Sequence, residues 1–171
     1  MSVTVTPVSG RRDLDAFIKL PFRLYRDDPS WVPPLLYLER QRFEPKTNPF
    51  LQHAEAQLFL ARRNGQVVGR ISAQVDNEHN RFHEERTGFF GFFESEDDPE
   101  TAQALFGVAE GWLRERGMEA ARLYRKSSLP SCGSLQATQG RAPCCRTIRS
   151  RWSSTAAASS GLRPGSNRAG W

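Results

Sequence analysis

The chain is 171 residues long, and 38% of its residues are apolar and 25% are charged, which suits a single globular domain with its own core. Its formal net charge is +5, but residues 1–121 hold all 19 acidic residues and 15 basic ones, whereas residues 122–171 hold nine basic residues and no acidic one. Because the positive charge is confined to the C-terminal part, it does not identify the whole chain as a nucleic-acid-binding protein.

Several other classes of protein lack support because their sequence signals are missing. No stretch reaches the ~18 apolar residues that span a bilayer, and the N-terminus has no apolar segment typical of a secretory signal. The three cysteines fit neither a disulfide framework nor a zinc spacing. We therefore expect a cytoplasmic protein that binds no membrane and no metal.

The first 25 residues predict a short strand followed by a helix. Valine and threonine alternate in residues 2–8, as they do in a strand with one buried face. Apolar residues then follow helical spacing, and Ser9 or Asp13 can cap this helix. Because proline lacks the backbone donor, we expect Pro21 to kink or break the helix and to begin a second short one.

Residues 27–43 predict a turn and a further helix. The sequence Asp-Asp-Pro-Ser at residues 27–30 is typical of a turn, and the Pro33-Pro34 pair favours an extended entry to the helix at residues 35–43. We expect the charged side chains of this helix to lie in solvent: Glu39, Arg40 and Arg42.

Two alternating runs of apolar and polar residues predict an antiparallel β-hairpin. The first run covers residues 55–63 and the second covers residues 66–77. The residues between them, Asn64 and Gly65, are preferred in a type I′ turn, in which both central residues need a positive φ.

A third strand is predicted after a polar connection. Residues 78–85 contain His79 and His83, but the zinc-protease pattern needs a glutamate directly after the first histidine, so we expect a connection rather than a metal site. Residues 87–94, Thr-Gly-Phe-Phe-Gly-Phe-Phe-Glu, predict the strand, in which Gly88 and Gly91 indicate a bulge or a close approach of backbones.

The next segment has clear signals for a long helix. Asp98 is suited to the N-cap, Pro99 to the first turn, and Gly117 to the position after the helix. Residues 118–124 then predict a fourth strand, with its pairing lost in the segment that follows. A hairpin, a strand, a helix and a strand in this order predict an α+β fold.

Residues 122–171 differ in composition from the rest of the chain. They include ten serines and eight arginines and have no helical or strand period. Such a segment buries too little apolar surface to offset the entropy of ordering, so we expect a low-complexity, disordered tail. We favour a coding sequence translated out of frame; a natural basic tail that binds polyanions without sequence preference is the alternative.

Five segments taken together carry a resemblance to a known family: residues 20–35, Asn48-Pro-Phe, His53-Ala-Glu, Val68-Gly-Arg70 and Gly88-Phe-Phe-Gly-Phe-Phe-Glu94. With the order of the predicted elements, they resemble a bacterial group of N-acetyltransferases of the GNAT superfamily. The resemblance implies the acyl-CoA N-acyltransferase fold, a mixed sheet with N-terminal helices. Members of that group are longer and contain a second GNAT-like unit, so we expect residues 1–121 to be an incomplete domain, the N-terminal part of such a protein.

The resemblance implies acyl transfer from acetyl-CoA to an amine on a small molecule or a peptide. The resemblance makes Glu94 the candidate catalytic base. The alternative is that Glu94 is an ordinary solvated carboxylate at the end of a strand. Tyr25 and Trp31 could line the mouth of the acceptor site, or pack in the core. The acyl arm would bind along the third strand, at Phe90, Gly91, Phe92 and Phe93. The phenylalanines of this strand could instead simply pack on both of its faces.

One segment argues against the usual binding of the coenzyme. Family members hold the diphosphate on backbone amides of a glycine-rich loop before the long helix. Residues 94–100 have no glycine and contain five carboxylates, which would repel a diphosphate. We therefore expect impaired transfer; the alternatives are a non-catalytic interaction module and a polyanion binder that acts through the basic tail.

Overall fold

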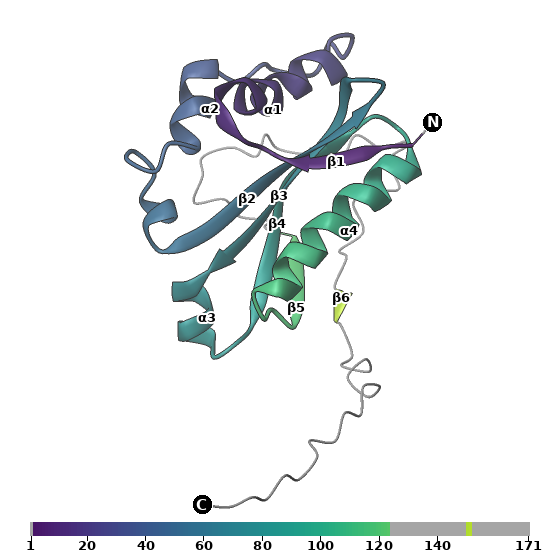
Figure 1. Ribbon diagram of the computed structural model, residues 1–171. Coiled ribbons are helices and arrows are strands. Elements are labelled where there is room, and N and C mark those ends of the chain that lie inside the picture. Colours follow the sequence, from purple (N-terminus) through teal and green to yellow (C-terminus); the bar gives the residue numbers. More distant parts are fainter. Residues whose placement is uncertain (1, 124–149, 152–171) are drawn as a thin grey trace, which may run out of the picture.

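A mixed six-stranded β-sheet forms the centre of the computed structural model, which describes residues 2–123 and 150–151 (Figure 1). The strands are β1 (Thr4–Pro7), β2 (Ala54–Arg63), β3 (Gln66–Asp76), β4 (Thr87–Ser95), β5 (Ala120–Leu123) and β6 (Ser150–Arg151). They lie in the sheet in chain order. The β4–β5 pair is parallel and the other pairs are antiparallel, which confirms the predicted mixed sheet.

Helices cover both faces of the sheet (Figure 1). One face carries α1 (Gly10–Leu24) and α2 (Leu36–Arg42), and the opposite face carries α4 (Pro99–Glu115). A short helix, α3 (Asn77–His83), and a 3-10 turn, η1 (Pro49–Gln52), lie in the connections. Within the described residues, no helix is both long and apolar enough to cross a membrane.

The predicted tail lies largely outside the described residues. Its predicted disorder, out-of-frame origin and polyanion binding concern residues 122–171, of which the structure describes residues 122–123 and 150–151. These residues lie in β5 and β6, so the predicted disorder is wrong for them. The pairing of the fourth strand is not lost, however. Strand β5 pairs with β4 from Thr87–Ala120 to Phe90–Leu123 on one side and with β6 on the other.

The predicted hairpin is confirmed as β2 and β3. Asn64 and Gly65 connect the two strands with φ angles of 52° and 76°, as a type I′ turn requires. Side chains of β3 alternate between the two faces of the sheet, so that apolar side chains meet α4 while Arg70, Ser72 and Gln74 are buried on the α1–α2 face.

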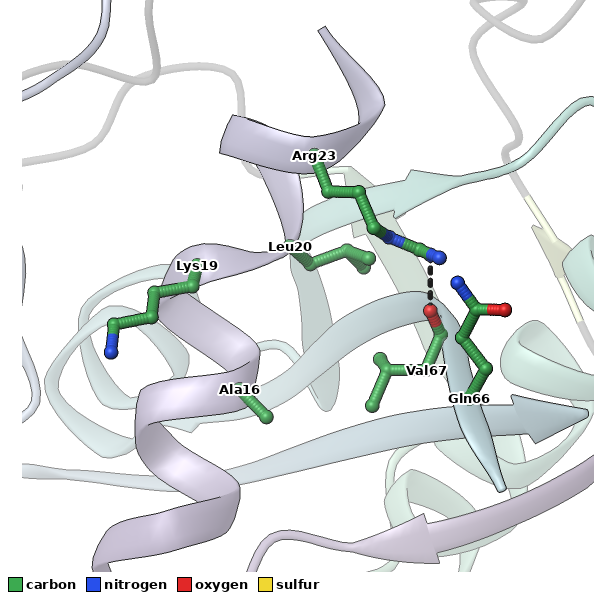
Figure 2. Close-up of a pocket in the computed structure, with 6 residues that line it drawn as sticks. All are labelled: Ala16, Lys19, Leu20, Arg23, Gln66 and Val67. Atoms are coloured by element: carbon green, nitrogen blue, oxygen red, sulfur yellow. Dashed lines mark hydrogen bonds between the residues drawn. The ribbon is translucent and has the colours of Figure 1, made fainter. Parts of the chain in front are cut away.

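Helix α1 continues through Pro21, so the predicted break and second helix are wrong. Proline cannot donate to the carbonyl four residues earlier, which belongs to Phe17. Arg70 of β3 donates to that carbonyl instead, with 2.6 Å between Nη1 and O. At the end of α1, Arg23 donates to the Val67 carbonyl and so attaches the helix to the start of β3 (Figure 2).

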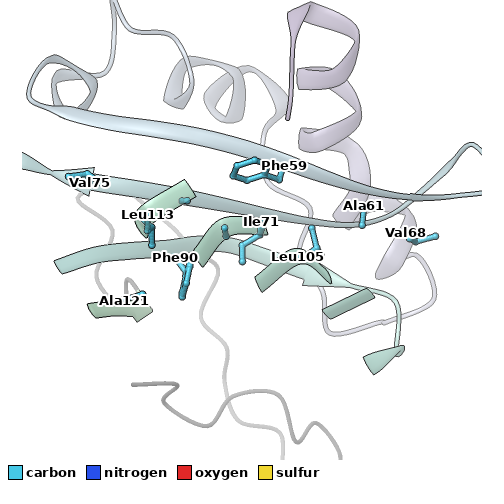
Figure 3. Packing of buried hydrophobic residues seen from close by; sticks show 11 residues of the cluster. Phe59, Ala61, Val68, Ile71, Val75, Phe90, Leu105, Leu113 and Ala121 are labelled. Carbon is cyan, nitrogen blue, oxygen red and sulfur yellow. The ribbon is translucent and has the colours of Figure 1, made fainter. Parts of the chain in front are cut away.

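The main core lies between α4 and the sheet (Figure 3). Its buried side chains come from β2, β3, β4, β5 and α4: Phe59, Ala61, Val68, Ile71, Ala73, Val75, Phe90, Leu105, Ala109, Leu113 and Ala121. The helix lies so close to β4 that a Cβ atom on Gly88 would be 2.5 Å from Leu113 Cδ2. The close contact at Gly88 is therefore with the Leu113 side chain and not with another backbone.

Candidate active site

Strand β4 contains a β-bulge in the middle of its aromatic run. Arg70 lies opposite Glu94 and Ser72 lies opposite Gly91, so Phe92 and Phe93 together face one residue of β3. Phe92 has a φ of 50°, an uncommon conformation for a residue other than glycine. The bulge predicted from Gly91 is therefore confirmed. The residue with the positive φ is not the glycine but its neighbour, Phe92.

The bulge distributes the aromatic side chains of β4 over both faces of the sheet. Phe90 and Phe93 contact Phe106 of α4, with ring centroids 5.5 Å and 4.6 Å apart. Phe92 lies on the opposite face, 5.1 Å from the ring of Phe43 and 6.2 Å from that of Phe17. Of the four residues expected to hold the acyl arm, only Gly91 and Phe92 lie on the face covered by α1 and α2.

Glu94 lies on the α1–α2 face and is largely removed from solvent. Its side chain is 24% exposed, and its Oε2 is 3.1 Å from Nη2 of Arg70, whose side chain is 6% exposed. Burial raises the pKa of Glu94 above its ordinary value; Arg70 opposes this rise and Glu39 adds to it. The alternative of a solvated strand-end carboxylate does not fit this environment.

A second buried ion pair comes from α2. The Glu39 and Arg42 side chains are each 8% exposed, and Oε1 of Glu39 is 2.9 Å from Nη1 of Arg42. Burial raises the pKa of Glu39, against the lowering influence of Arg42 and Arg70. The expectation that Glu39 and Arg42 are solvated is therefore wrong, while Arg40 is exposed and pairs with Asp15 at 3.1 Å.

Helix α2 thus buries two charged side chains and exposes apolar ones together with Arg40. Its only buried residues are Glu39 and Arg42, whereas Tyr37 and Leu38 are exposed. With Arg70 and Glu94, these two residues form a cluster of four charged side chains from α2, β3 and β4. Sequence reasoning missed Arg70 as a site residue, although Val68-Gly-Arg70 is one of the segments that carry the family resemblance.

The predicted acceptor residues lie in a separate aromatic group. The ring of Trp31 is 5.2 Å from that of Phe22 and 5.7 Å from that of Tyr25. The structure therefore brings Tyr25 and Trp31 together, but in a group of their own and not in the cluster around Glu94. Their role at the mouth of an acceptor site remains a prediction.

The start of α4 is occupied by its own cap. The Asp98 carboxylate accepts hydrogen bonds from the amides of Thr101 (3.0 Å) and Glu100 (3.4 Å), and Pro99 has no amide hydrogen. Asp98 also pairs with Arg63. Hydrogen bonds from Thr101 and Arg63 lower the pKa of Asp98 to about 2.

This arrangement does not fit the diphosphate of a coenzyme. The first amides of α4 already have an acceptor, and that acceptor is a carboxylate that stays ionised at neutral pH. Arginines pair with four of the five carboxylates of the segment, which sequence reasoning did not foresee: Arg70 with Glu94, Arg23 with Glu96, and Arg63 with Asp98 and Glu100. The crowding of acidic groups is thus partly neutralised, but the amides stay engaged.

Two other features contribute nothing to the cluster. A pocket of about 290 Å³ lies between α1 and the start of β3, lined by side chains that include Lys19 and Arg23 (Figure 2). In α3, the rings of His79 and His83 are 4.3 Å apart and His79 packs on Phe89. Among residues 2–123 and 150–151, no three His, Cys, Asp or Glu side chains gather in a way that could hold a metal ion.

Comparison by sequence finds two bacterial relatives. The chain is 49% identical over 116 residues to a protein of Caulobacter vibrioides named bacterial ceramide synthase. The aligned region covers 67% of this chain and 30% of the relative. The chain is 45% identical over 108 residues to protein YghO of Escherichia coli, covering 63% of this chain and 27% of the relative. The chain thus spans less than a third of the length of these relatives. No family model matches it.

Comparison by structure identifies the fold. A tandem GNAT protein from the clavulanic acid biosynthesis pathway superposes with a TM-score of 0.55 at 13% identity, over 71% of this chain and 36% of that one. PaiA N-acetyltransferase from Thermoplasma acidophilum, solved in complex with coenzyme A, superposes with a TM-score of 0.50 at 13% identity, over 76% of this chain and 83% of that one. The described domain has the fold of the GNAT superfamily of N-acetyltransferases.

Proposed function

We propose that the chain forms part of an N-acyltransferase that joins the acyl group of a pantetheine thioester to the amine of a long-chain amino alcohol. The amine nitrogen bonds to the thioester carbonyl carbon and the carbon–sulfur bond breaks. The proton lost by the amine passes through Glu94 to the departing sulfur. The products are an amide and a free thiol.

The observation that carries this proposal is the place of Glu94 beside a bulged strand. An amine must lose a proton before its nitrogen can form a new bond, so the reaction needs a base close by. Burial raises the pKa of Glu94 and brings it nearer to neutral pH, which makes it a stronger base than a solvated glutamate. The rings of Phe17, Phe43 and Phe92 adjoin the cluster and limit the access of water.

Strand β4, which contains Glu94, is the proposed binding site for the arm of the donor, although the start of α4 does not fit a diphosphate. The described pairing with β5 covers only residues 87–90 of β4. Residues 91–95 therefore have backbone groups on that side that are not engaged by a described strand. A pantetheine arm presents amides that can pair with such groups. When bound, a thioester donor supplies the activated carbonyl.

The acceptor class is inferred from the relative in Caulobacter vibrioides. That protein is named a ceramide synthase, and a ceramide is the amide of a fatty acid with a long-chain amino alcohol. An identity of 49% over 116 residues supports a related acceptor for this chain.

The cap of α4 favours a second candidate, a GNAT-like module that binds no coenzyme. Asp98 engages the amides on which the diphosphate would otherwise bind, as a structural cap does. In such a module the cluster around Glu94 would serve only to hold α2 on the sheet.

The test is an acyl-transfer assay on the full chain. The purified protein is incubated with sphinganine and either palmitoyl-CoA, acetyl-CoA or S-palmitoyl-pantetheine, and the amide product is measured by mass spectrometry. We expect Glu94→Gln to lower the rate by about 100-fold or more, because loss of a general base typically costs that much. The matched control is Glu96→Gln, since Glu96 is on the same segment but pairs with Arg23.

The donor series separates the two candidates. Product from wild type that is lost in Glu94→Gln and kept in Glu96→Gln supports the transferase. No product from any donor, together with no heat of binding for coenzyme A by calorimetry, would overturn it in favour of the coenzyme-free module. Equal rates with palmitoyl-CoA and S-palmitoyl-pantetheine would support a donor held by its arm alone.

A further inference from the structure

The guanidinium of Arg70, on β3, contacts two other elements of the fold at once, α1 and β4. Its Nη1 donates to the Phe17 carbonyl of α1 at 2.6 Å, and its Nη2 is 3.1 Å from Oε2 of Glu94 on β4. Its Cζ lies 4.9 Å from the ring centroid of Phe17 and 5.9 Å from that of Phe92. The whole residue is 5% exposed, so the contacts are made away from solvent.

The Phe17 carbonyl accepts this bond because of a proline one helical turn later. In an uninterrupted helix that carbonyl would accept the amide of residue 21, but Pro21 has no amide hydrogen. A helix carbonyl without its usual donor is a strong acceptor, and Arg70 occupies it. The position of the guanidinium is thus determined by the backbone of α1 and not by Glu94 alone.

We infer that Arg70 is the positioning residue of the site, which anchors on α1 through the Phe17 carbonyl and holds the Glu94 carboxylate in one orientation beside the bulge. This inference rests on the proposed function, in which Glu94 is the base. The guanidinium is planar and rigid, so fixing Nη1 at Phe17 also fixes the place of Nη2, which lies 3.1 Å from Oε2 of Glu94 in an ion pair.

The charged groups around Glu94 agree with this role. Arg70 faces it from β3, and Glu39, itself paired with Arg42, faces it from α2. Burial and Glu39 both favour the protonated carboxyl, whereas Arg70 favours the carboxylate. Without Arg70, the pKa of Glu94 would rise further and less of the base would be ionised at a given pH.

The test measures the ionisation of Glu94 directly. The full chain is labelled with ¹³C at the glutamate side-chain carboxyl, the Glu94 signal is assigned with Glu94→Gln, and its titration midpoint is compared in wild type, Arg70→Gln and Arg70→Lys. We expect the midpoint to move to higher pH in Arg70→Gln and to move less in Arg70→Lys, which keeps the charge. Where turnover is measured, kcat/KM of the Arg70 variant should be lower than that of wild type at pH values below the Glu94 midpoint, by about tenfold for each pH unit by which the midpoint has moved. Above the midpoint of the variant, kcat/KM should recover.

The control is another arginine that ties α1 to the sheet. Arg62 of β2 pairs with Asp13 of α1 at 2.9 Å and is not among the groups around Glu94. Arg62→Gln should leave the Glu94 midpoint unchanged. An unchanged midpoint in folded Arg70→Gln and Arg70→Lys, or an equal displacement in Arg62→Gln, would overturn the inference. Because the titration needs no turnover, an inactive wild-type chain would count against the proposed function and not against the link between Arg70 and Glu94.

Discussion

The contact between Gly88 and Leu113 gives the most direct test of how α4 packs on β4. A Cβ atom on Gly88 would lie 2.5, 2.8 and 3.0 Å from three side-chain carbons of Leu113, whereas carbon atoms pack best at about 3.5–4.0 Å. Leu113 is 0% exposed and lies in the core cluster, so its side chain can move away only toward other core side chains. We expect Gly88→Ala to lower the free energy of unfolding by about 1–3 kcal/mol, as overpacking of a core does.

A double-mutant cycle isolates this contact. Leu113→Ala alone should cost about 2–5 kcal/mol, because it leaves a cavity. It also removes the three carbons that an alanine at position 88 would meet, so the added methyl group should cost little in that background. We expect a coupling energy of about 1–3 kcal/mol. Urea denaturation, followed by tryptophan fluorescence, to which Trp112 next to Leu113 contributes, measures all four unfolding free energies.

The control is the same substitution at a glycine with open surroundings. A Cβ atom on Gly107 of α4 meets nothing within 4 Å, so Gly107→Ala should stabilise the protein by about 0.5–1 kcal/mol through its helix propensity. If Gly88→Ala behaved like Gly107→Ala, or if the costs of Gly88→Ala and Leu113→Ala simply added, the close packing described for α4 would be wrong.

Two further predictions concern Pro21 and Asp98. Pro21→Ala restores an amide donor to the Phe17 carbonyl, so we expect a higher urea midpoint of unfolding. We also expect the titration midpoint of Glu94 to move to higher pH, as in Arg70→Gln. A lower urea midpoint, or an unchanged Glu94 titration, contradicts this. The pKa of Asp98 is lowered from 3.8 to about 2, so its contribution to stability is present above pH 3.8 and is lost as the pH falls through 2. The urea midpoint of wild type should therefore drop more between pH 4 and pH 2 than that of Asp98→Asn, and parallel curves would refute the assignment.

The elements that were predicted correctly are those whose signals are local. The Asn64-Gly65 turn and the cap of α4 at Asp98 each depend on residues within a few positions, and each was confirmed. The glycines of β4 predicted a bulge or a close approach of backbones; the bulge is confirmed, whereas the contact at Gly88 is made by the Leu113 side chain.

The parts that could not be predicted depend on partners distant in the sequence. Pro21 indicated a broken helix because the donor that satisfies Phe17 comes from Arg70, on another element. Glu39 and Arg42 have the spacing of an ordinary exposed pair on a helix, and nothing nearby in the sequence indicates that this side of α2 faces the sheet. The proposed base, Glu94, could be named from the family resemblance, but its burial and its arginine partner could not be predicted.

The buried ion pair between Glu39 and Arg42 of α2 limits how these two positions can evolve. Loss of either member of a buried ion pair leaves an uncompensated charge, at a cost of about 3–5 kcal/mol, whereas exchanging both for apolar residues is often tolerated. Single replacements at Glu39 or Arg42 should therefore be rare among descendants of this sequence, and lineages that depart from the pair should have changed both codons.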